Sequence, residues 1–218
     1  ASAAVDPERT VFRVASVSKA LTATTAAVLA AEGRVDLERD VREWLGDFRF
    51  PHPPDGPLTL AQLLTHTAGL DSRHIGMFAR DADDVRPLAE YLADRLPPRT
   101  TPPDRTTRYS NHGVALAGLV LERAADRPFD ALVRERLLRP LGMTWSTFSQ
   151  PLPPEMVARM ARPEARCDTP PCGPAALDYR QTPPAGGFVT TAADMARFLT
   201  AQLGRVPEGA ADRRDVFT

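Results

Sequence analysis

The chain has 218 residues, of which 43% are hydrophobic and 25% are charged, and its net charge is −1. This is the composition of a soluble globular protein, and the near-zero charge leaves no basic field that would recruit nucleic acid. The longest uncharged stretch of the first quarter, residues 20–31, is too short to span a membrane. Three charged residues within the first ten argue against a signal peptide there, although a processed or trimmed chain would look the same.

In chain order, residues 10–16 (TVFRVAS) alternate only in part and predict at most a short strand. A helix is predicted over Ser16–Glu32. Because its residues 20–31 carry no charge, we expect it to be buried nearly all round. Gly33 stands where a C-terminal cap belongs.

A second helix is predicted to begin at Thr59, because Gln62 completes a capping box with it, and to end at Gly69. Three more helices are predicted: Gly113–Ala125, a helix from Pro128 to Pro140, and a helix opened by Thr191 and Asp194 with Met195, Phe198 and Leu199 facing inward. Residues 186–191 are compatible with a short strand. The 22 prolines fall largely between these segments, so the sequence predicts a mostly helical protein without a large sheet.

Two cysteines, Cys167 and Cys172, lie in the sequence CDTPPC. Their spacing favours a small disulfide-closed loop over a metal site, since no other cysteine or nearby histidine completes a ligand set. Two free thiols in a surface loop are the alternative.

Lys19 is the only lysine among 27 basic residues, and it follows Ser16 by three positions. Residues three apart share a helical face, so the amine should face the Ser16 hydroxyl and turn away from Ser18. The uncharged flank should lower the pKa of Lys19 by desolvation, which would let it accept the serine proton. Arginine cannot do this, because its guanidinium does not lose a proton in proteins. An ordinary helix start is the alternative interpretation.

A second polar segment, RYSNHG, follows a proline-rich loop and contains Tyr109 and Asn111. A phenol near a lysine ammonium can shuttle protons, and an amide can bind a substrate carbonyl or fix Lys19. A simple turn with a packed tyrosine would show the same residues.

Taken together, these motifs resemble the serine β-lactamase-related family, which includes class C β-lactamases, D-alanyl-D-alanine carboxypeptidases and related esterases. The family has S-x-x-K followed by Y-x-N, here separated by 93 residues from Ser16 to Tyr109. The resemblance covers nearly the whole chain through the stretches FRVASVSKALTA, LTLAQLLTHTAGL, RYSNHGVALAGLVLE, LLRPLGMTWSTF and PAGGFVTTAADMARFL.

The resemblance implies an α+β, β-lactamase/transpeptidase-like fold in which Ser16 is acylated and Lys19 assists its activation. Tyr109 would be the general base for acylation and the acid for the leaving group, and Asn111 would contact the substrate amide or ester. The backbone N–H of Ser16 would supply half of an oxyanion hole. Neither a cofactor nor a metal is implied.

Other conspicuous residues receive structural interpretations. His66, in LLTHTAGL, resembles a family stretch that ends a helix, so we do not expect it to carry protons. His112 could line the cleft beside the Y-x-N motif, while His52 and His74 are expected in loops. Gly186 and its neighbour Gly187 should allow a tight turn near the site, since no phosphate-binding pattern accompanies them.

The sequence departs from the family in one motif. A third triplet, K-T-G or H-x-G, is missing, since Lys19 is the only lysine and no histidine follows His112. Residues 1–218 are therefore expected to form a partial domain: the helical part and the nucleophile helix, with few strands because most N-terminal and C-terminal strands are absent. The missing motif would then lie in an absent C-terminal part or in another chain. Loss of the second oxyanion donor costs about 10²- to 10³-fold in rate, so we expect this chain alone to be poorly stable or inactive.

The leading functional hypothesis is a serine hydrolase that forms an acyl-enzyme on an ester, amide or β-lactam bond, more plausibly an esterase or D-amino-acid peptidase than a true β-lactamase. The alternatives are a non-catalytic penicillin-recognising or scaffold relative, an inactive fragment, and an unrelated helical module. We expect a small-molecule or peptide substrate and no nucleic acid. The possible disulfide and the family's habits favour an exported protein, and the oligomeric state stays open.

Overall fold

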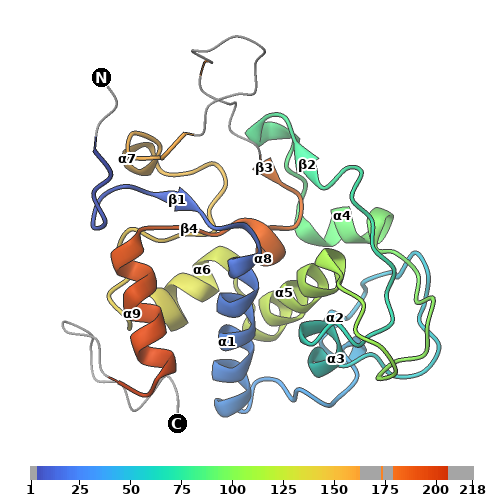
Figure 1. Cartoon of the computed structure of the whole chain (residues 1–218). Helices are drawn as coiled ribbons and strands as arrows, with labels where there is room; N and C mark the ends of the chain where they lie inside the picture. The colour runs from blue at the N-terminus through green and yellow to red at the C-terminus, as the bar shows by residue number, and fades with distance from the viewer. Residues whose placement is uncertain (1–3, 163–172, 174–178, 206–218) are drawn as a thin grey trace.

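The structure is a computed structural model and describes residues 4–162, 173 and 179–205. Within these residues, short helices joined by loops dominate, and their arrangement is shown in Figure 1. The helices are α1 (Ser18–Ala31), α2 (Arg42–Leu45), α3 (Leu60–Leu64), α4 (Leu88–Arg95), α5 (Asn111–Ala125), α6 (Phe129–Val133), α7 (Pro154–Val157), α8 (Pro183–Gly186) and α9 (Ala192–Gln202). The strands are β1 (Phe12–Arg13), β2 (Phe78–Ala79), β3 (Tyr179–Arg180) and β4 (Val189–Thr190).

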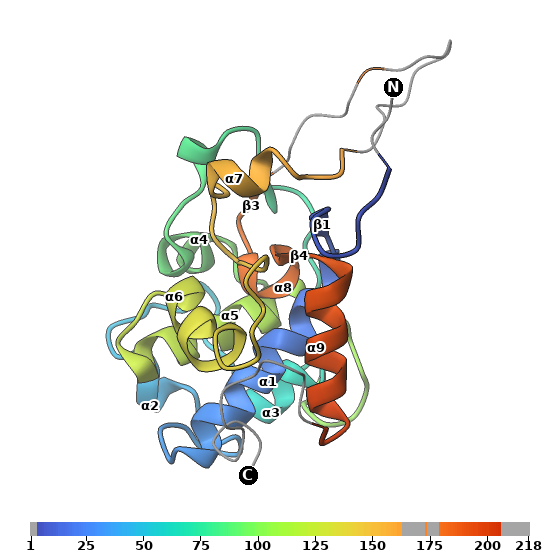
Figure 2. The same cartoon turned by 90° about the vertical axis from the view of Figure 1, so that its left-hand side faces the viewer.

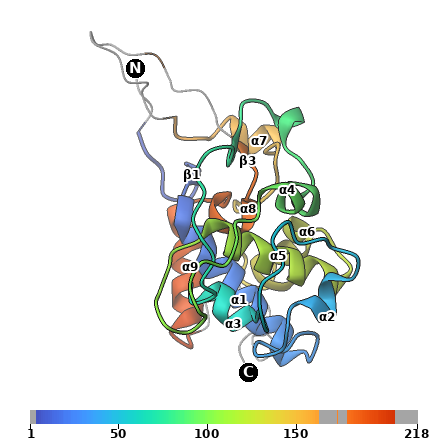
Figure 3. The same ribbon diagram turned by 90° about the vertical axis from the view of Figure 1, so that its right-hand side faces the viewer.

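Helix α5 occupies the centre of the fold and is buried without interruption from His112 to Leu121. Its sequence accounts for this position, because the first eleven residues carry no charged side chain that would need water. Ser110 caps the helix by accepting from the Gly113 N–H, and Asp126 ends it in the left-handed conformation. Helices α1, α2, α3, α4, α6 and α8 pack around it, several of which are visible in Figure 3.

Helix α1 presents two different faces. Leu21, Thr22, Thr25 and Leu29 are among its buried residues, whereas Ala20, Ala27 and Ala31 are exposed. The prediction that this helix is buried nearly all round is therefore wrong, because alanine is small and uncharged and fits an exposed face as readily as a core. The predicted cap is confirmed, since Gly33 adopts φ 70°.

The capping box of α3 is confirmed, with Thr59 and Gln62 bonding reciprocally. Its predicted end is not, because α3 stops at Leu64 and Gly69 belongs to a later turn packed against the backbone of Thr101. In α9, Leu199 is 56% exposed instead of facing inward, while Phe198 is buried.

Two small antiparallel sheets complete the described fold. Strand β1 pairs with β4, with Phe12 opposite Thr190, so both segments predicted as possible strands are confirmed and pair with each other. Strand β2 pairs with β3, with Phe78 opposite Arg180. Each pairing joins segments that are far apart in the sequence, and the β1–β4 pair holds the start of α1 close to α8.

Helix α9 runs beside α1, as Figures 1 and 2 show from two directions, and Gln202 Nε2 donates to Thr24 Oγ1 at 3.0 Å. Within the part of the chain that the structure describes, none of the helices combines the length and apolar character needed to cross a membrane.

Candidate active site

Ser16 lies on a tight turn between β1 and α1. Ala15 adopts φ 44°, a conformation uncommon for residues other than glycine, and Ala15–Val17 form a single 3₁₀ turn. Ser16 thus precedes the α-helix instead of lying within it, and it is exposed. The 3₁₀ turn runs directly into α1, so residues three apart still share a face, and Lys19 Nζ donates to Ser16 Oγ at 3.2 Å.

Ser18 fixes this turn and points away from Lys19, as predicted. Its buried hydroxyl donates to the Ala15 carbonyl at 2.5 Å and accepts from the Phe188 N–H at 3.0 Å. One turn further on, Thr22 Oγ1 donates to the Pro184 carbonyl at 2.7 Å. These bonds attach the start of α1 to the segment around α8.

Lys19 has three hydrogen-bond partners from three different segments. Besides Ser16, its Nζ donates to Asn111 Oδ1 at 2.8 Å and to the Ala185 carbonyl at 2.5 Å. Burial lowers the pKa of Lys19, contacts with Tyr109 oppose this shift, and the positive charge of Arg180 adds to it. The net effect is a pKa below that of a free lysine, as the sequence predicts.

Tyr109 closes the cluster from the other side. Its hydroxyl lies 2.6 Å from Ser16 Oγ, and Lys19 Nζ lies 4.8 Å from the ring centroid. Burial raises the pKa of Tyr109. Its side-chain contacts with Lys19 and Ser16, together with the charge of Lys19, lower the pKa by a larger amount, so the net shift is downward. Tyr109 as a residue is 47% exposed and can therefore meet a ligand.

Asn111, the first residue of α5, joins the cluster through Lys19 and also directs Nδ2 toward Met77 Sδ at 3.8 Å. The structure thus brings Ser16, Lys19, Tyr109 and Asn111 together from two motifs that lie more than ninety residues apart.

Sequence reasoning missed the Ala185 carbonyl. It is exposed to Lys19 because α8 is a single turn whose carbonyl groups have few partners within the helix. The only signal was the expectation that Gly186 and Gly187 form a tight turn near the site, and the structure places them there.

His112 does not line the site. It is fully buried, and its Nε2 lies 3.1 Å from the Tyr91 hydroxyl. Burial, assisted by the charge of Arg73, lowers the pKa of His112 to about 4. The suggestion that it faces the cleft is wrong, because the helix directs position 112 into the core while Asn111 faces Lys19.

His66, in contrast, contacts the site through Tyr109. The two rings have centroids 4.5 Å apart with planes inclined by 36°. His66 follows α3 with φ 63°, so the expected position just past a helix end is observed, but the ring contact was not anticipated. Cys167 and Cys172 lie outside the described residues.

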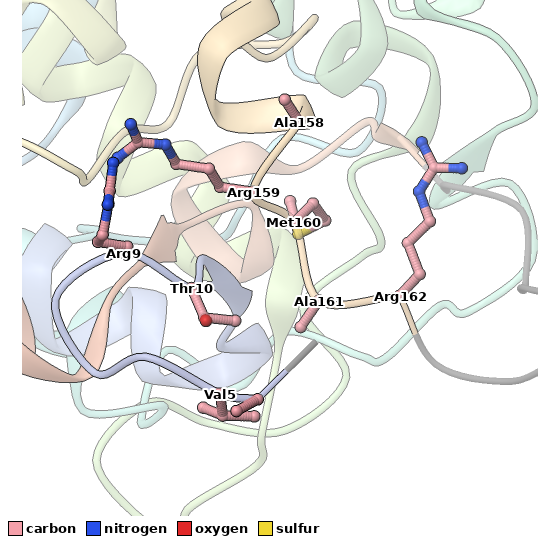
Figure 4. A pocket seen from close by; sticks show the side chains of 9 residues that line it. Val5, Arg9, Thr10, Ala158, Arg159, Met160, Ala161 and Arg162 are labelled. Carbon is pink, nitrogen blue, oxygen red and sulfur yellow. The ribbon is translucent and has the colours of Figure 1, made fainter. Parts of the chain in front are cut away.

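A separate groove of about 610 Å³ lies between the N-terminal segment and residues 158–162 (Figure 4). Arg9, Arg159 and Arg162 contribute to its lining, and the guanidinium of Arg159 stacks on Trp145 at 3.8 Å. None of the four clustered side chains lines this groove, so the candidate active site is defined by its hydrogen bonds and not by this cavity. Among the described residues, no group of three His, Cys, Asp or Glu side chains is placed to hold a metal ion.

The helical layer around α5, the serine-bearing turn before α1 and the lysine and tyrosine that meet it define a protein of the β-lactamase/transpeptidase-like fold. The sequence model of the Beta-lactamase family matches residues 2–217. The chain belongs to this family.

Three relatives illustrate its range. Penicillin-binding protein 4 of Amycolatopsis lactamdurans is 30% identical over 206 residues, covering 91% of this chain and 53% of the relative. Esterase EstB of Burkholderia gladioli is 37% identical over 151 residues, covering 62% of this chain and 38% of the relative. The crystal structure of D-alanine carboxypeptidase AmpC from Burkholderia cenocepacia is 30% identical, with a TM-score of 0.71, covering 95% of this chain and 54% of that structure. The chain spans about half the length, or less, of the relatives it matches.

Proposed function

We propose that this chain carries the acylation machinery of a serine hydrolase in which Ser16 forms an acyl-enzyme with an ester, amide or β-lactam. One observation carries the proposal: Ser16 Oγ lies within hydrogen-bonding distance of both Tyr109 Oη, at 2.6 Å, and Lys19 Nζ, at 3.2 Å. A serine alcohol is a weak nucleophile until a neighbouring base takes its proton, and both neighbours are groups that can do so.

Two proton arrangements fit this geometry with the same total number of protons. In the first, Lys19 is an ammonium that donates to Ser16, Asn111 and Ala185, and the serine proton points to a Tyr109 phenolate. In the second, Lys19 is a neutral amine that accepts a hydrogen bond from the Ser16 hydroxyl, and Tyr109 is a neutral phenol that donates a hydrogen bond to Ser16 Oγ. Lowered pKa values at both Lys19 and Tyr109 support a pair that exchanges one proton at small cost.

We assign the role of base to Tyr109. Its oxygen is nearer to Ser16 than the amine is, and its exposure lets it reach the leaving group. Lys19 is half-buried and already held by Asn111 and Ala185, which suits a fixed cation that stabilises the phenolate.

In the proposed reaction, the Ser16 proton passes to the Tyr109 phenolate as Ser16 Oγ bonds to the carbonyl carbon. The backbone N–H of Ser16 donates to the developing oxyanion. Tyr109 then returns the proton to the departing alcohol or amine as its bond to the carbonyl carbon breaks. In deacylation, the Tyr109 phenolate accepts a proton from the water whose oxygen bonds to the acyl carbon, and Tyr109 then returns that proton to Ser16 Oγ as the bond between Ser16 Oγ and the acyl carbon breaks. Asn111 fixes Lys19 and offers its amide to the substrate.

An esterase or D-amino-acid peptidase activity is our preferred assignment within this class. It is supported by the relatives named an esterase and a D-alanine carboxypeptidase. A non-catalytic, penicillin-recognising role is the second candidate, because another relative is named a penicillin-binding protein. The motifs present specify acylation, and the substrate is decided by other parts of the site.

The test uses a fluorescent penicillin, a fluorophosphonate and a p-nitrophenyl ester, with mass spectrometry of the intact chain and its peptides. We expect covalent mass on Ser16, none in Ser16→Ala, and labelling slowed about 10²- to 10⁴-fold in Tyr109→Phe, because the general base is lost. Ser18→Ala is the matched control. It should still label, although leaving the Phe188 N–H unpaired should cost about 1 to 3 kcal/mol of unfolding free energy.

Ester turnover would favour the hydrolase, and penicillin labelling without turnover would favour the penicillin-recognising role. A folded chain that no probe labels, both alone and within any longer form of the protein, would contradict the proposal.

A further inference from the structure

His66 holds the segment that carries Tyr109 at two points. The Arg108 N–H donates to the His66 carbonyl at 2.8 Å, and the Ser110 N–H donates to His66 Nδ1 at 3.2 Å. The residues before and after Tyr109 are thus both hydrogen-bonded to one histidine. Between these bonds, the imidazole ring lies against the phenol, with ring centroids 4.5 Å apart.

Tyr109 needs such support because of where it lies. It is 47% exposed on the segment that leads into α5, yet its hydroxyl must stay 2.6 Å from Ser16. An exposed phenol with two rotatable bonds loses this position easily, and a flat ring on one face restricts it. A misplacement of about 1 Å at a reacting group can cost on the order of 10²-fold in rate.

We propose that His66 is the positioning residue of Tyr109 and acts only as a neutral imidazole, an inference that rests on the proposed function. The hydrogen-bond donor at Ser110 requires a lone pair on Nδ1, so the ring carries its hydrogen on Nε2. Among the described residues, His66 makes no hydrogen bond to Ser16 or Lys19, and its effect therefore passes through Tyr109 and Ser110.

Electrostatics favour the same neutral form. Burial and the nearby charge of Lys19 both lower the pKa of His66. Protonation would add a cation beside Lys19 and replace the Nδ1 acceptor with a donor facing the Ser110 N–H. Nearby along the chain, Arg108 pairs with Asp71 at 3.0 Å, and Asp104 accepts from Thr67. Among the described residues, the hydrogen bonds and ion pairs of these side chains go to partners other than the imidazole.

Two variants separate the two functions of the ring. His66→Asn keeps an acceptor near Nδ1 and tolerates the left-handed backbone, but it removes the ring face. His66→Phe keeps a ring against Tyr109 and removes the acceptor. His52→Asn is the matched control, because His52 is exposed and lies outside the candidate site.

The first readout is the rate of Ser16 labelling by the fluorophosphonate between acidic and alkaline pH. We expect both His66 variants to label about 10- to 100-fold more slowly at neutral pH, with little change in the concentration of probe that half-saturates the rate. The wild-type rate should fall more steeply on the acid side than the His66→Asn rate, because only the wild type has the imidazole to protonate.

The second readout is the ultraviolet titration of the Tyr109 phenol, obtained as the difference from Tyr109→Phe. We expect the phenol of both His66 variants to titrate at higher pH than in the wild type, since a displaced ring loses its contacts with Lys19 and Ser16. An unchanged Tyr109 titration together with wild-type labelling rates in both variants would overturn the proposal for His66. If the wild type labels with no probe, both alone and within any longer form of the protein, the proposed function fails, and the titration alone still decides the role of His66.

Discussion

Arg180 influences the candidate base pair through charge. It lies on β3, with its guanidinium 4.1 Å from the Phe78 ring centroid, and two bonds from the Gln150 side chain hold its backbone. Burial is the main reason why the pKa of Lys19 is low, and the Arg180 charge lowers it further. The protonation of the Lys19–Tyr109 pair should therefore depend on a residue that takes no part in the proposed reaction.

This dependence gives a prediction for Arg180→Gln. Removing a positive charge makes the ammonium form of Lys19 less unfavourable, so the pKa of Lys19 rises. Because Lys19 and Tyr109 share one proton, the pair should then lose its first proton at higher pH, and the rise of the Ser16 labelling rate with pH should move to higher pH. Arg39→Gln is the control, because Arg39 pairs with Glu43 on the surface away from the site. A shift toward lower pH, or an equal shift in both variants, would contradict this account.

The sequence predicted the four residues that the structure brings together at the candidate site, because their side chains carry distinctive chemistry. A lone lysine after a serine and a tyrosine before an asparagine form patterns that can be read along the chain. The Ala185 carbonyl could not be predicted, because every residue has a carbonyl and only folding decides which one meets Lys19. The family resemblance at His66 predicts a position at a helix end, which agrees with its backbone, but it does not predict the contact of the ring with Tyr109.

At the level of elements, the packing of α5 against α8 depends on one small residue. A Cβ at Gly118 would lie 2.3 Å from Pro184 Cγ, far inside any normal contact, so glycine is what permits the approach. Pro184 directly precedes Ala185, whose carbonyl binds Lys19. The contact between Gly118 and Pro184 therefore also affects the position of that carbonyl. Helix α8 itself is not predicted, because two prolines followed closely by Gly186 and Gly187 indicate only a turn.

Gly118→Ala should therefore displace α8. We expect a loss of about 1 to 3 kcal/mol of unfolding free energy from overpacking, with slower Ser16 labelling. Gly113→Ala, in the same helix, is the control, because its Cβ would find neighbours at 3.5 to 3.6 Å, an ordinary contact. That control should be neutral or stabilising by about 0.5 to 1 kcal/mol, since alanine favours helices. The free energies of unfolding of both variants are measured with urea. Equal values for Gly118→Ala and Gly113→Ala would contradict the prediction that the Gly118 position is overpacked by a methyl group.

At the scale of the whole molecule, stability should depend on the buried pair of His112 and Tyr91. His112 Nδ1 has no hydrogen-bond partner within the described part of the chain, and burial keeps the ring neutral, with a pKa of about 4. The unfolded chain takes up this proton near the ordinary pKa of histidine. The contribution of neutral His112 to the free energy of unfolding is therefore complete above about pH 6.5, and it is lost progressively as the pH falls toward 4.

The loss attributed to His112 should reach on the order of 3 kcal/mol near pH 4, at about 1.4 kcal/mol per pKa unit. His112→Gln, which can still bond to Tyr91, should be less stable at pH 7 but should lose less stability on acidification. Unfolding free energies of the two proteins at pH 7 and pH 4.5 provide the measurement. Parallel losses in the two proteins would show that other groups govern the acid transition.

The global arrangement follows from the sequence only in outline. The motifs indicate the fold class. The strand at residues 12–13 lies inside a segment that alternates in part, and the strand at residues 189–190 lies inside a segment compatible with a short strand. Their pairing with each other could not be read from local patterns, because nothing in either segment specifies a partner so distant. The same limit applies to β2 and β3, which follow no recognisable alternation.

The contacts that build the Ser16 turn span most of the chain: 93 residues to Tyr109, 166 from Lys19 to Ala185, and 170 from Ser18 to Phe188. Closing such large loops has an entropic cost that helices, with their local bonds, do not bear. During translation, Ser16 therefore leaves the ribosome long before Tyr109 and Phe188, and helical structure can form well before these distant contacts do. The cluster around Ser16 is therefore complete only once the segments that carry Tyr109, Ala185 and Phe188 have reached it.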